Sequence, residues 1–285
     1  MKILVLGANG LIGSTMMRVL ATQTDWQVLG TVRTRHNLLP HVPADRLVVG
    51  VEFTNPDALP RLLLEEAPDV VVNCAGLTKH LPGGNDPIPA LTLNALLPHR
   101  LAELCRLAGA RLIHISSDCV FSGKAGNYLE SDHPDATDIY GKSKHLGEVT
   151  GDGAITLRTS TIGHELDTRY GLLEWFLAQT ECKGFKKAVF SGLPTVVLAE
   201  VVRDLVIPNA HLTDLYHVGA SPIDKFSLLQ LIAKTYKRDV IIHADDTFVI
   251  DRSLNTEKFF EATSYRAPAW PELIDIMYSN QSQKS

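Results

Sequence analysis

The amino-acid sequence predicts an α/β protein built on a doubly wound parallel sheet, with a smaller lobe in its C-terminal part. Up to about residue 158, short runs of β-branched residues alternate with longer amphipathic stretches, which indicates strand–helix–strand units. Right-handed crossovers between parallel strands place helices on both faces of such a sheet. Beyond Arg158 the alternation loosens. We therefore expect one domain over 1–160 and a smaller lobe over 161–285, with about 195–220 packing back on the first domain.

Each expected element follows from its own hydrophobic pattern. Continuous apolar runs predict buried strands, and apolar residues at helical spacing predict helices. In the first part, strands are expected at 3–6, 28–32, 47–51, 70–73, 112–116 and 155–157, and helices at 11–22, 56–66, 88–108 and 139–149. In the second part, helices are expected at 170–180, 196–207, 226–236 and 271–278, and strands at 216–218 and 240–242. Leu101 and Leu107 are among the core candidates of the helix over 88–108.

Composition excludes several functional classes. The formal net charge is -5, and without a basic patch we expect no nucleic-acid partner. The four cysteines form no C-x-x-C pair and the eleven histidines no H-E-x-x-H motif, so neither a disulfide framework nor a metal site is expected. The sequence shows no signal peptide and no run of about 18 apolar residues. We therefore expect a cytoplasmic protein without a membrane partner.

A glycine-rich turn follows the first expected strand. Gly7, Gly10 and Gly13 have the spacing G-x-x-G-x-x-G where that strand ends and a helix begins. Glycine is needed where the backbone turns tightly and approaches a pyrophosphate, and the helix N-terminus offers N–H groups to the anion. The turn therefore predicts a Rossmann-type dinucleotide site. The cofactor contacts expected in it are Gly7, Asn9, Gly10, Leu11, Ile12 and Gly13.

The end of the second expected strand indicates which dinucleotide is bound. NAD enzymes tend to carry an acidic residue there, which binds the ribose hydroxyls. This chain instead has Arg33 and Arg35, with no acidic residue nearby. Arg33 can stack on adenine and, with Arg35, pair with a 2′-phosphate. We expect NADPH, with NADH as the alternative if both arginines lie on a solvated loop.

Tyr140 and Lys144 lie four residues apart on an expected helix, so they share one face. A phenol has a reference pKa near ~10, and a neighbouring ammonium group favours the phenolate. The pair therefore predicts that the pKa of Tyr140 is lowered by very roughly one to three units. Tyr140 can then give a proton to a carbonyl oxygen as hydride arrives, while Lys144 holds the nicotinamide ribose. In isolation, a surface tyrosine and lysine on one helix would explain the spacing.

Two hydroxyl side chains and an acid, Ser116, Ser117 and Asp118, end the strand expected over 112–116. At the carboxyl end of a central strand they would face the crevice where doubly wound sheets bind ligands. One hydroxyl can hold the substrate oxygen as negative charge develops on it. In isolation, a turn explains the serines equally well. The glycine turn, the serine pair and the Tyr–Lys helix in this order form a specific combination.

At these residues the chain resembles the extended short-chain dehydrogenase/reductase family, and within it the dTDP-4-dehydrorhamnose reductase branch. The resemblance spans most of the chain and is strongest before Ser160. It is carried by GANGLIG at 7–13, DVVVNCAG at 69–76, ISSDCVFSG at 115–123, YGKSKHLGE at 140–148, LRTS at 157–160 and DRSLNTEKF at 251–259.

The resemblance implies NAD(P)H-dependent reduction of the 4-keto group of a 6-deoxy sugar carried on a nucleoside diphosphate. It makes Tyr140 the acid, Lys144 its partner, and Ser117 the hydroxyl where the branch usually has threonine. The family also suggests a homodimer. Further cofactor contacts are expected at Glu52, Phe53, Cys74, Ala75, Gly76, Asn94 and Ser116, besides Tyr140 and Lys144.

Several positions depart from the branch. Cys119 stands where the branch has tyrosine, and the segments 78–84 and 190–195 differ from its usual ones. The substrate is therefore expected to be dTDP-4-dehydrorhamnose-like or a UDP-linked N-acetylated 6-deoxy-4-keto-hexose, used in surface polysaccharide synthesis. A sugar nucleotide carries a diphosphate, so basic residues should face it. The substrate contacts expected are Lys79, Ser117, Asp118 and Arg252.

Two other functions share these features. Sugar-nucleotide epimerases and dehydratases have the same glycine turn and Tyr–Lys pair but retain NAD, so the fold alone does not decide between them and a reductase. Arg33 favours NADPH and hence net reduction, and Asp118 followed by Cys119 is not the Asp–Glu pair expected of a dehydratase. The second alternative is a non-catalytic NADP-binding regulatory subunit. Such a chain often loses the tyrosine or the lysine, and this one keeps both.

Overall fold

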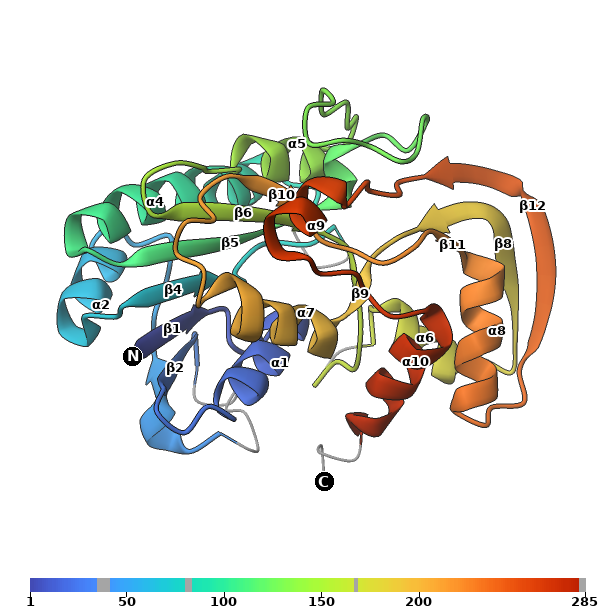
Figure 1. Ribbon diagram of the computed structural model, residues 1–285, viewed down its shortest axis with the longest axis horizontal. Coiled ribbons are helices and arrows are strands. Elements are labelled where there is room, and N and C mark those ends of the chain that lie inside the picture. Colours follow the sequence, from blue (N-terminus) through green and yellow to red (C-terminus); the bar gives the residue numbers. More distant parts are fainter. Residues whose placement is uncertain (35–41, 80–83, 167–168, 282–285) are drawn as a thin grey trace.

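The computed structural model describes residues 1–34, 42–79, 84–166 and 169–281, and it confirms the doubly wound parallel sheet (Figure 1). Seven strands run in the order β10-β6-β5-β4-β1-β2-β3, and every neighbouring pair is parallel. Their bounds are β1 Lys2–Leu6, β2 Gln27–Val32, β3 Leu47–Val49, β4 Val70–Asn73, β5 Arg111–Ser117, β6 Ala154–Thr159 and β10 Leu215–His217.

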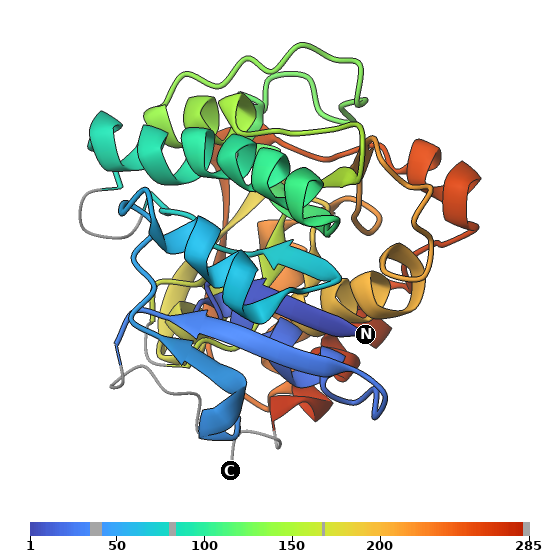
Figure 2. The same cartoon turned by 90° about the vertical axis from the view of Figure 1, so that its left-hand side faces the viewer.

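Helices cover both faces of this sheet, which explains why its strands are continuously apolar in sequence. Ile3 and Val5 of β1 face a core that includes residues of α1 and α7, whereas Leu4 and Leu6 face a second core with α2 and α4. Figures 1 and 2 show α4 and α5 on one side of the sheet and α1 and α7 on the other. The bounds are α1 Leu11–Leu20, α2 Ala58–Glu66, α4 Leu97–Ala108, α5 Ile139–Leu146 and α7 Thr195–Val201.

The helix expected over 88–108 is not a regular α-helix throughout. It consists of α3 (Pro87–Ala90), a π-helical turn η3 (Leu91–Leu96) and α4. The prediction that Leu107 lies in the core is wrong, because its side chain is 74% exposed in the last turn of α4, whereas Leu101 is fully buried. A second π-helical turn, η5 (Val202–Val206), continues α7.

The smaller lobe is built around a three-stranded sheet in the order β11-β8-β12. β8 (Glu181–Phe190) pairs antiparallel with β11 (Ile223–Asp224) and parallel with β12 (Ile241–Asp251), and α8 (Lys225–Thr235) packs on it. A two-stranded ribbon of β7 (Thr161–Ile162) and β9 (Leu193–Pro194) leads from the large sheet into the lobe. The remaining helices are α6 Leu172–Leu177, α9 Glu257–Thr263 and α10 Trp270–Ser279, and the 3-10 turns are η2 Ala44–Arg46 and η4 Asp118–Val120.

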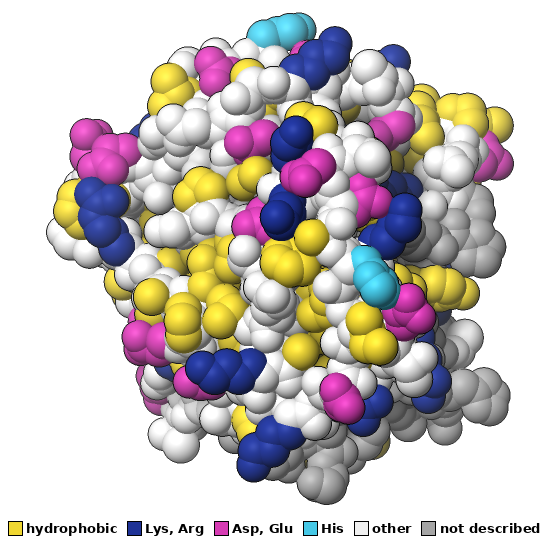
Figure 3. Space-filling model, turned by 90° about the vertical axis from the view of Figure 1, so that its right-hand side faces the viewer, with side chains coloured by type: hydrophobic (Ala, Val, Ile, Leu, Met, Phe, Trp, Pro, Cys, Tyr) yellow, Lys and Arg dark blue, Asp and Glu magenta, His cyan; other side chains and the backbone are white. Residues whose placement is uncertain are grey.

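The lobe differs most from the sequence prediction. The strand β8 and the helix α9 were not expected, and β12 is much longer than the strand expected over 240–242. Both long strands have many exposed residues, and exposed strands need no regular apolar alternation. Figure 3 shows the side of the molecule that carries this lobe, with hydrophobic side chains near its middle and charged ones around them. Phe248 and Val249 of β12 are among the exposed hydrophobic residues.

Two segments of the second part join the large sheet. β10 extends it beside β6, and α7 packs against α1. Both lie within the segment 195–220 that we expected to pack back on the first domain. None of the helices in the described ranges combines the length and the hydrophobicity that crossing a membrane requires.

Candidate active site

The candidate site lies at the carboxyl ends of β1, β4 and β5. From β1 the chain proceeds to β2 and β3 on one side of the sheet and then crosses to β4 on the other side. The strand order therefore reverses between β1 and β4, and doubly wound sheets bind ligands at such a switch point. The glycine turn, the segment after β4 and the serines at the end of β5 all reach this place.

The turn after β1 is shaped for close backbone approach. Gly7 has a φ of +73°, and a Cβ at this position would lie only 2.9 Å from the Cα of Ala75. A Cβ on Gly13 would collide with the carbonyl oxygen of Gly7. No side chain in the described ranges caps the N-terminus of α1 at Gly10, which leaves the first N–H groups of the helix available to a phosphate. Asn9, Leu11 and Ile12 lie in or directly after this turn.

The end of β2 provides the second part of the predicted cofactor site. Arg33 is exposed there, and its guanidinium has no hydrogen bond or ion pair with the described part of the chain. Gly50 N–H donates to the Val32 carbonyl at 3.0 Å, which ties the segment after β3 to this end. That segment continues to Glu52 and Phe53, for which the predicted cofactor contacts stay predictions. Arg35 lies outside the described residues.

Cys74, Ala75 and Gly76 follow β4 along the switch point, and Asn94 of η3 fixes the segment after them. The Asn94 amide donates to the Leu77 carbonyl at 2.9 Å and to the Ser143 hydroxyl at 3.1 Å, and accepts from Leu77 N–H at 2.8 Å. Both amide N–H groups are therefore used within the protein. The cofactor contact predicted for Asn94 stays a prediction, and the π-helical turn places this amide where it bridges the segment after β4 and α5.

Tyr140 and Ser117 meet at the end of β5. The Asp138 carboxylate caps α5 by accepting from Gly141 N–H at 2.7 Å, so the helix begins just before Tyr140. Gly141 also lets α5 approach the turn after β5, because a Cβ there would collide with the carbonyl of Cys119. The Ser117 hydroxyl lies near enough to the Tyr140 phenol to act on its pKa, and it donates to the Asp118 carboxylate at 3.2 Å. The structure therefore brings together two of the three predicted catalytic side chains.

The pKa of Tyr140 differs from the prediction. Burial raises the pKa of the phenol, the nearby Cys119 and Asp118 raise it further, and the Ser117 hydroxyl opposes them. This contradicts the lowered pKa that the Tyr–Lys spacing predicts. The raised pKa keeps the phenol protonated at neutral pH, which is the form that a proton donor requires.

Lys144 explains the difference. Its ammonium group donates to the Ile115 carbonyl at 2.7 Å, in the middle of β5, instead of to the phenol. Burial lowers the pKa of Lys144 to about 8, and the nearby Glu148 and Cys74 oppose the shift. A buried cation next to Cys74 also opposes the rise in pKa, to about 12, that burial imposes on that thiol.

Ser116 points away from Ser117, because successive residues of a strand face opposite sides. Its hydroxyl donates to Glu148 at 2.8 Å. Arg158 of β6 holds both oxygens of the same carboxylate at 2.7 Å, and both side chains are buried. The cofactor contact predicted for Ser116 stays a prediction, and its hydroxyl is already used within the protein. Its hydroxyl belongs to a buried ion-pair network beneath the site.

Charged groups lie on the side of Ser117 that faces the lobe. Asp118 is buried, which raises its pKa, while Arg252 and the Ser117 hydroxyl lower it. Arg252 follows β12, donates to the Phe121 carbonyl at 2.9 Å and lies 3.4 Å from the Cys119 sulfur. The structure therefore brings the predicted substrate contacts Ser117, Asp118 and Arg252 together, and Lys79 is close enough for its charge to act on Cys119.

Lys225 was missed by the sequence prediction. It is the first residue of α8, and its ammonium nitrogen lies 4.1 Å from the centroid of the Phe190 ring. Burial lowers the pKa of Lys225 to about 8, Asp118 and Cys119 oppose this, and Lys79 adds to it. A lysine in the first turn of a helix opposes the helix dipole. This unfavourable position of Lys225 at a helix start is the sequence signal that could have marked it as a functional residue.

This arrangement supports a particular chemistry. Tyr140 and Ser117 can hold and protonate a carbonyl oxygen, while Lys79, Lys225 and Arg252 supply positive charge toward an anionic group such as a diphosphate. Within the ranges that the structure describes, no group of three or more metal-ligating side chains occurs.

The sequence is similar to known proteins over most of its length. The family model of the RmlD substrate binding domain matches residues 1–247. A dTDP-4-dehydrorhamnose reductase from Burkholderia thailandensis is 35% identical over 167 residues, which cover 57% of this chain and 50% of that protein. A probable low-salt glycan biosynthesis reductase from Haloferax volcanii is 32% identical over 227 residues, covering 76% of this chain and 73% of the relative. The match therefore spans about half the length of the first relative and nearly three quarters of the second.

The fold is also shared with a solved structure. The dTDP-4-dehydrorhamnose reductase from Bacillus anthracis in complex with NADP has a TM-score of 0.79 to this chain. The two are 18% identical, and the superposition covers 98% of this chain and 99% of that one. At this identity the likeness establishes the common fold of both parts of the molecule.

Proposed function

Because this chain belongs to the RmlD substrate binding domain family of extended short-chain dehydrogenases/reductases, we propose that it is an NADPH-dependent reductase of a keto group on a nucleotide-linked sugar. The observation that carries the proposal is the placement of Tyr140 beside Ser117 at the switch point of the sheet. In this proposal, residues 1–160 bind the cofactor and 161–285 select the substrate. The relatives that are named as reductases support it.

The cofactor fits the residues present. Gly7 and Gly13 leave room for a pyrophosphate beside the open N-terminus of α1. The exposed, unpaired Arg33 offers a guanidinium to a 2′-phosphate, and this supports NADPH over NADH. When bound, NADPH supplies the hydride that is added to the carbonyl carbon.

In the proposed mechanism, Tyr140 is the proton donor. Its raised pKa keeps the proton on the phenol until a carbonyl oxygen gains charge, and this oxygen is a stronger acceptor in the transition state than in the ground state. Ser117, beside the phenol, can donate to the same substrate oxygen. Lys144, whose ammonium group is fixed to the Ile115 carbonyl, holds the nicotinamide ribose in this proposal.

The substrate proposed is a sugar nucleotide with a 4-keto-6-deoxy sugar. Arg252, Lys225 and Lys79 provide positive charge on the lobe side of Ser117, which suits a diphosphate. Asp118 lies near enough to Arg252 and Lys225 for their charges to act on it, and it can accept a hydrogen bond from a sugar hydroxyl. Cys119, in place of the family's tyrosine, supports a sugar other than the one that the dTDP-4-dehydrorhamnose reductases reduce, such as a UDP-linked N-acetylated one.

The experiment that tests this function measures the loss of reduced nicotinamide absorbance with purified protein. NADPH and NADH are compared against 4-keto sugar nucleotides made in place by dehydratases from dTDP-glucose and UDP-N-acetylglucosamine. We expect NADPH to be consumed with one of these substrates, and consumption to require the substrate. Tight NADP binding without consumption by any of them would contradict the reductase and favour the regulatory subunit.

A further inference from the structure

A cavity of about 290 Å³ lies beside α1, on the face of the sheet opposite α2 and α4. Val28 of β2 and Val196 of α7 belong to its lining, together with Val42 and Arg46, which precede β3. A connection between parallel strands is usually an α-helix that covers the sheet. In the described part of the connection between β2 and β3, the only helical element is the short turn η2.

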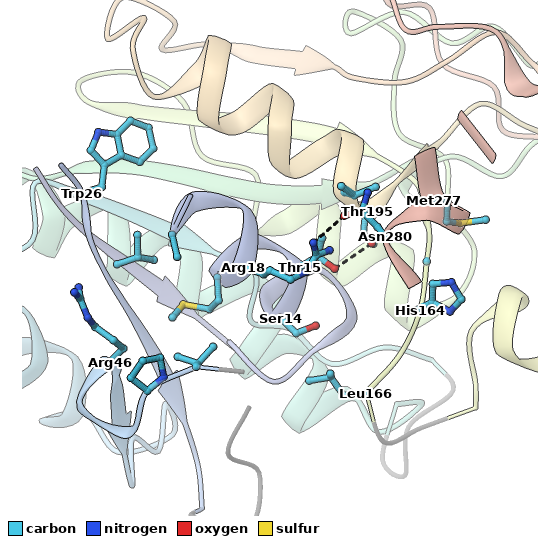
Figure 4. A pocket seen from close by; sticks show the side chains of 17 residues that line it. Ser14, Thr15, Arg18, Trp26, Arg46, His164, Leu166, Thr195, Met277 and Asn280 are labelled. Atoms are coloured by element: carbon cyan, nitrogen blue, oxygen red, sulfur yellow. Dashed lines mark hydrogen bonds between the residues drawn. The ribbon is translucent and has the colours of Figure 1, made fainter. Parts of the chain in front are cut away.

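The lining is mainly apolar, and a hydrogen bond between α1 and α7 fixes the end of the cavity near the lobe. Met17, Trp26 and Met277 contribute apolar surface to it. At the end near the lobe, the Thr15 hydroxyl of α1 hydrogen-bonds the Thr195 hydroxyl of α7 at 3.2 Å, and Figure 4 shows this bond. The volume is close to the lower limit of about 300 Å³ found for small-molecule pockets. The cavity can therefore take a compact ligand with an apolar body.

The charged side chains of the lining are all basic. Arg18, held by Asn280 at 2.8 Å, lies in the middle of the cavity in Figure 4, and Arg46 lies at the end near Trp26. Burial lowers the pKa of Arg18, and Glu200, which is outside the lining, opposes the shift. The Arg46 guanidinium has no hydrogen bond or ion pair with the described part of the chain. Among the described residues that line the cavity none is acidic.

The cavity is distinct from the candidate active site. None of the described lining residues is one that we assign to cofactor or substrate. It lies along the flank of α1 behind the glycine turn, between Ser14 at one end of the helix and Ala21 at the other. His164, part of its wall, is held by Glu174 at 2.9 Å and by the Tyr236 hydroxyl at 2.8 Å, so this wall is fixed by the lobe.

We propose that this cavity is a second small-molecule site, which binds an organic anion with an aromatic or aliphatic body next to Arg46 and Arg18. The apolar lining takes the body of the ligand, and the Arg46 guanidinium pairs with its carboxylate, sulfonate or phosphate. An uncharged ligand would leave the Arg46 guanidinium without a partner, and a cationic one would be repelled by both arginines.

The probe for this site is 8-anilinonaphthalene-1-sulfonate, which has an aromatic body and one sulfonate. Its fluorescence is titrated with the full-length protein in the presence of saturating NADP, so that the cofactor site is filled. We expect saturable binding with one site per chain. Saturable binding that appears only when NADP is left out, or no saturable binding at all, would overturn the proposal.

Three variants locate the probe. Arg46→Ala is expected to weaken binding about tenfold, because a hydrogen bond to a charged group is lost, and Arg46→Lys should retain most of it. The matched control is Arg61→Ala, which removes an exposed arginine of α2 and should bind like the wild type. Equal affinity of Arg46→Ala and Arg61→Ala would overturn the assignment.

A blocking variant makes the test independent of charge. Ala21 lines the cavity and is exposed at the end of α1, so Ala21→Trp adds an indole without disturbing the buried core. We expect it to reduce probe affinity at least about tenfold by filling the apolar space, with unchanged thermal unfolding. Unchanged affinity in this variant would contradict binding in the cavity.

Discussion

The two parts of the molecule use charge in opposite ways. In the part with the large sheet, the charged groups near the site are buried and fully partnered: Glu148 is held by Arg158 and Ser116, and Lys144 by the Ile115 carbonyl. In the lobe, ion pairs such as Lys183–Asp245 and His243–Glu181 are largely at the surface, and the basic groups beside Asp118 are left to face a ligand. The first arrangement fixes geometry, whereas the second one leaves positive charge to be neutralised on binding.

This difference assigns separate tasks to the two parts. Fixed groups around Tyr140 and Ser117 suit a reaction that needs a preorganised proton donor. Basic groups at the lobe suit recognition of an anionic substrate, and their number and position can change without disturbing the reacting pair. Changes in the first part should therefore alter turnover or stability, and changes in the lobe should alter substrate affinity.

The largest effect is expected from Tyr140→Phe. Removing the proton donor should lower kcat by about 10²–10⁴-fold, while NADPH binding stays near normal because the backbone of the glycine turn is untouched. Steady-state rates with the 4-keto sugar nucleotide measure kcat, and equilibrium titrations measure NADPH binding. A variant that turns over at the wild-type rate would remove Tyr140 from the mechanism.

The second prediction concerns stability. Glu148→Gln leaves the buried Arg158 cation without its carboxylate, and breaking a buried pair in this way should lower the free energy of unfolding by about 3–5 kcal/mol. Glu181→Gln, which breaks an exposed pair on β8, is the matched change in the lobe and should have little effect. Denaturant unfolding of both variants makes the comparison, and equal losses would show that burial does not distinguish the two regions.

The third prediction concerns the lobe and pH. Lys225→Met should raise the KM for the sugar nucleotide about tenfold at pH 7, because one charged contact to the diphosphate is lost, with kcat little changed. Since the pKa of Lys225 is lowered to about 8, its charge is present below pH 8 and lost above. The wild-type KM should therefore rise as pH passes 8.

Two variants control this prediction. Lys225→Arg keeps its charge at all these pH values, so it should bind substrate well and show a weaker rise in KM. Lys234→Met changes an exposed lysine of the same helix and should behave like the wild type. A pH-dependent KM that persists unchanged in Lys225→Met would assign the titration to another group.

The smallest effect is expected from Arg33→Ala. The arginine is exposed, so solvent and salt weaken its pairing with a 2′-phosphate. We expect NADPH affinity to fall roughly three- to tenfold and NADH affinity to remain unchanged, measured by equilibrium titration with each cofactor. Equal losses for the two cofactors would rule out a phosphate contact by Arg33.

The same contrast explains what the sequence could predict. In the large sheet, Val70–Asn73 and its neighbours are buried on both faces, so their strands stand out as apolar runs, and Gly7 and Gly13 mark the turn that backbone contact requires. The order of the strands then places Ser117 and Tyr140 together, because the carboxyl ends of parallel strands meet at one edge. The core of the site followed from these local signals.

What the sequence could not predict depends on contacts between distant segments. The sequence around Lys225 does not show that it lies near Asp118, because only the packing of α8 against β8 brings the two together. Asn94 and Ser116 have residue types that suit cofactor contacts, but the atoms they bond are set by neighbours on α5 and β6. The exposed strand β8 carries no regular alternation because little of its surface is buried.

The most direct test of the central claim follows the hydride. NADPH carrying deuterium at the transferable position of the nicotinamide is incubated with the protein and the 4-keto sugar nucleotide that it consumes, and the product is analysed by mass spectrometry and NMR. The account predicts one deuterium on the carbon of the former keto group and one equivalent of NADP formed for each product. A converted sugar without deuterium and without net consumption of NADPH would contradict it, and would identify an enzyme that retains and recycles its cofactor.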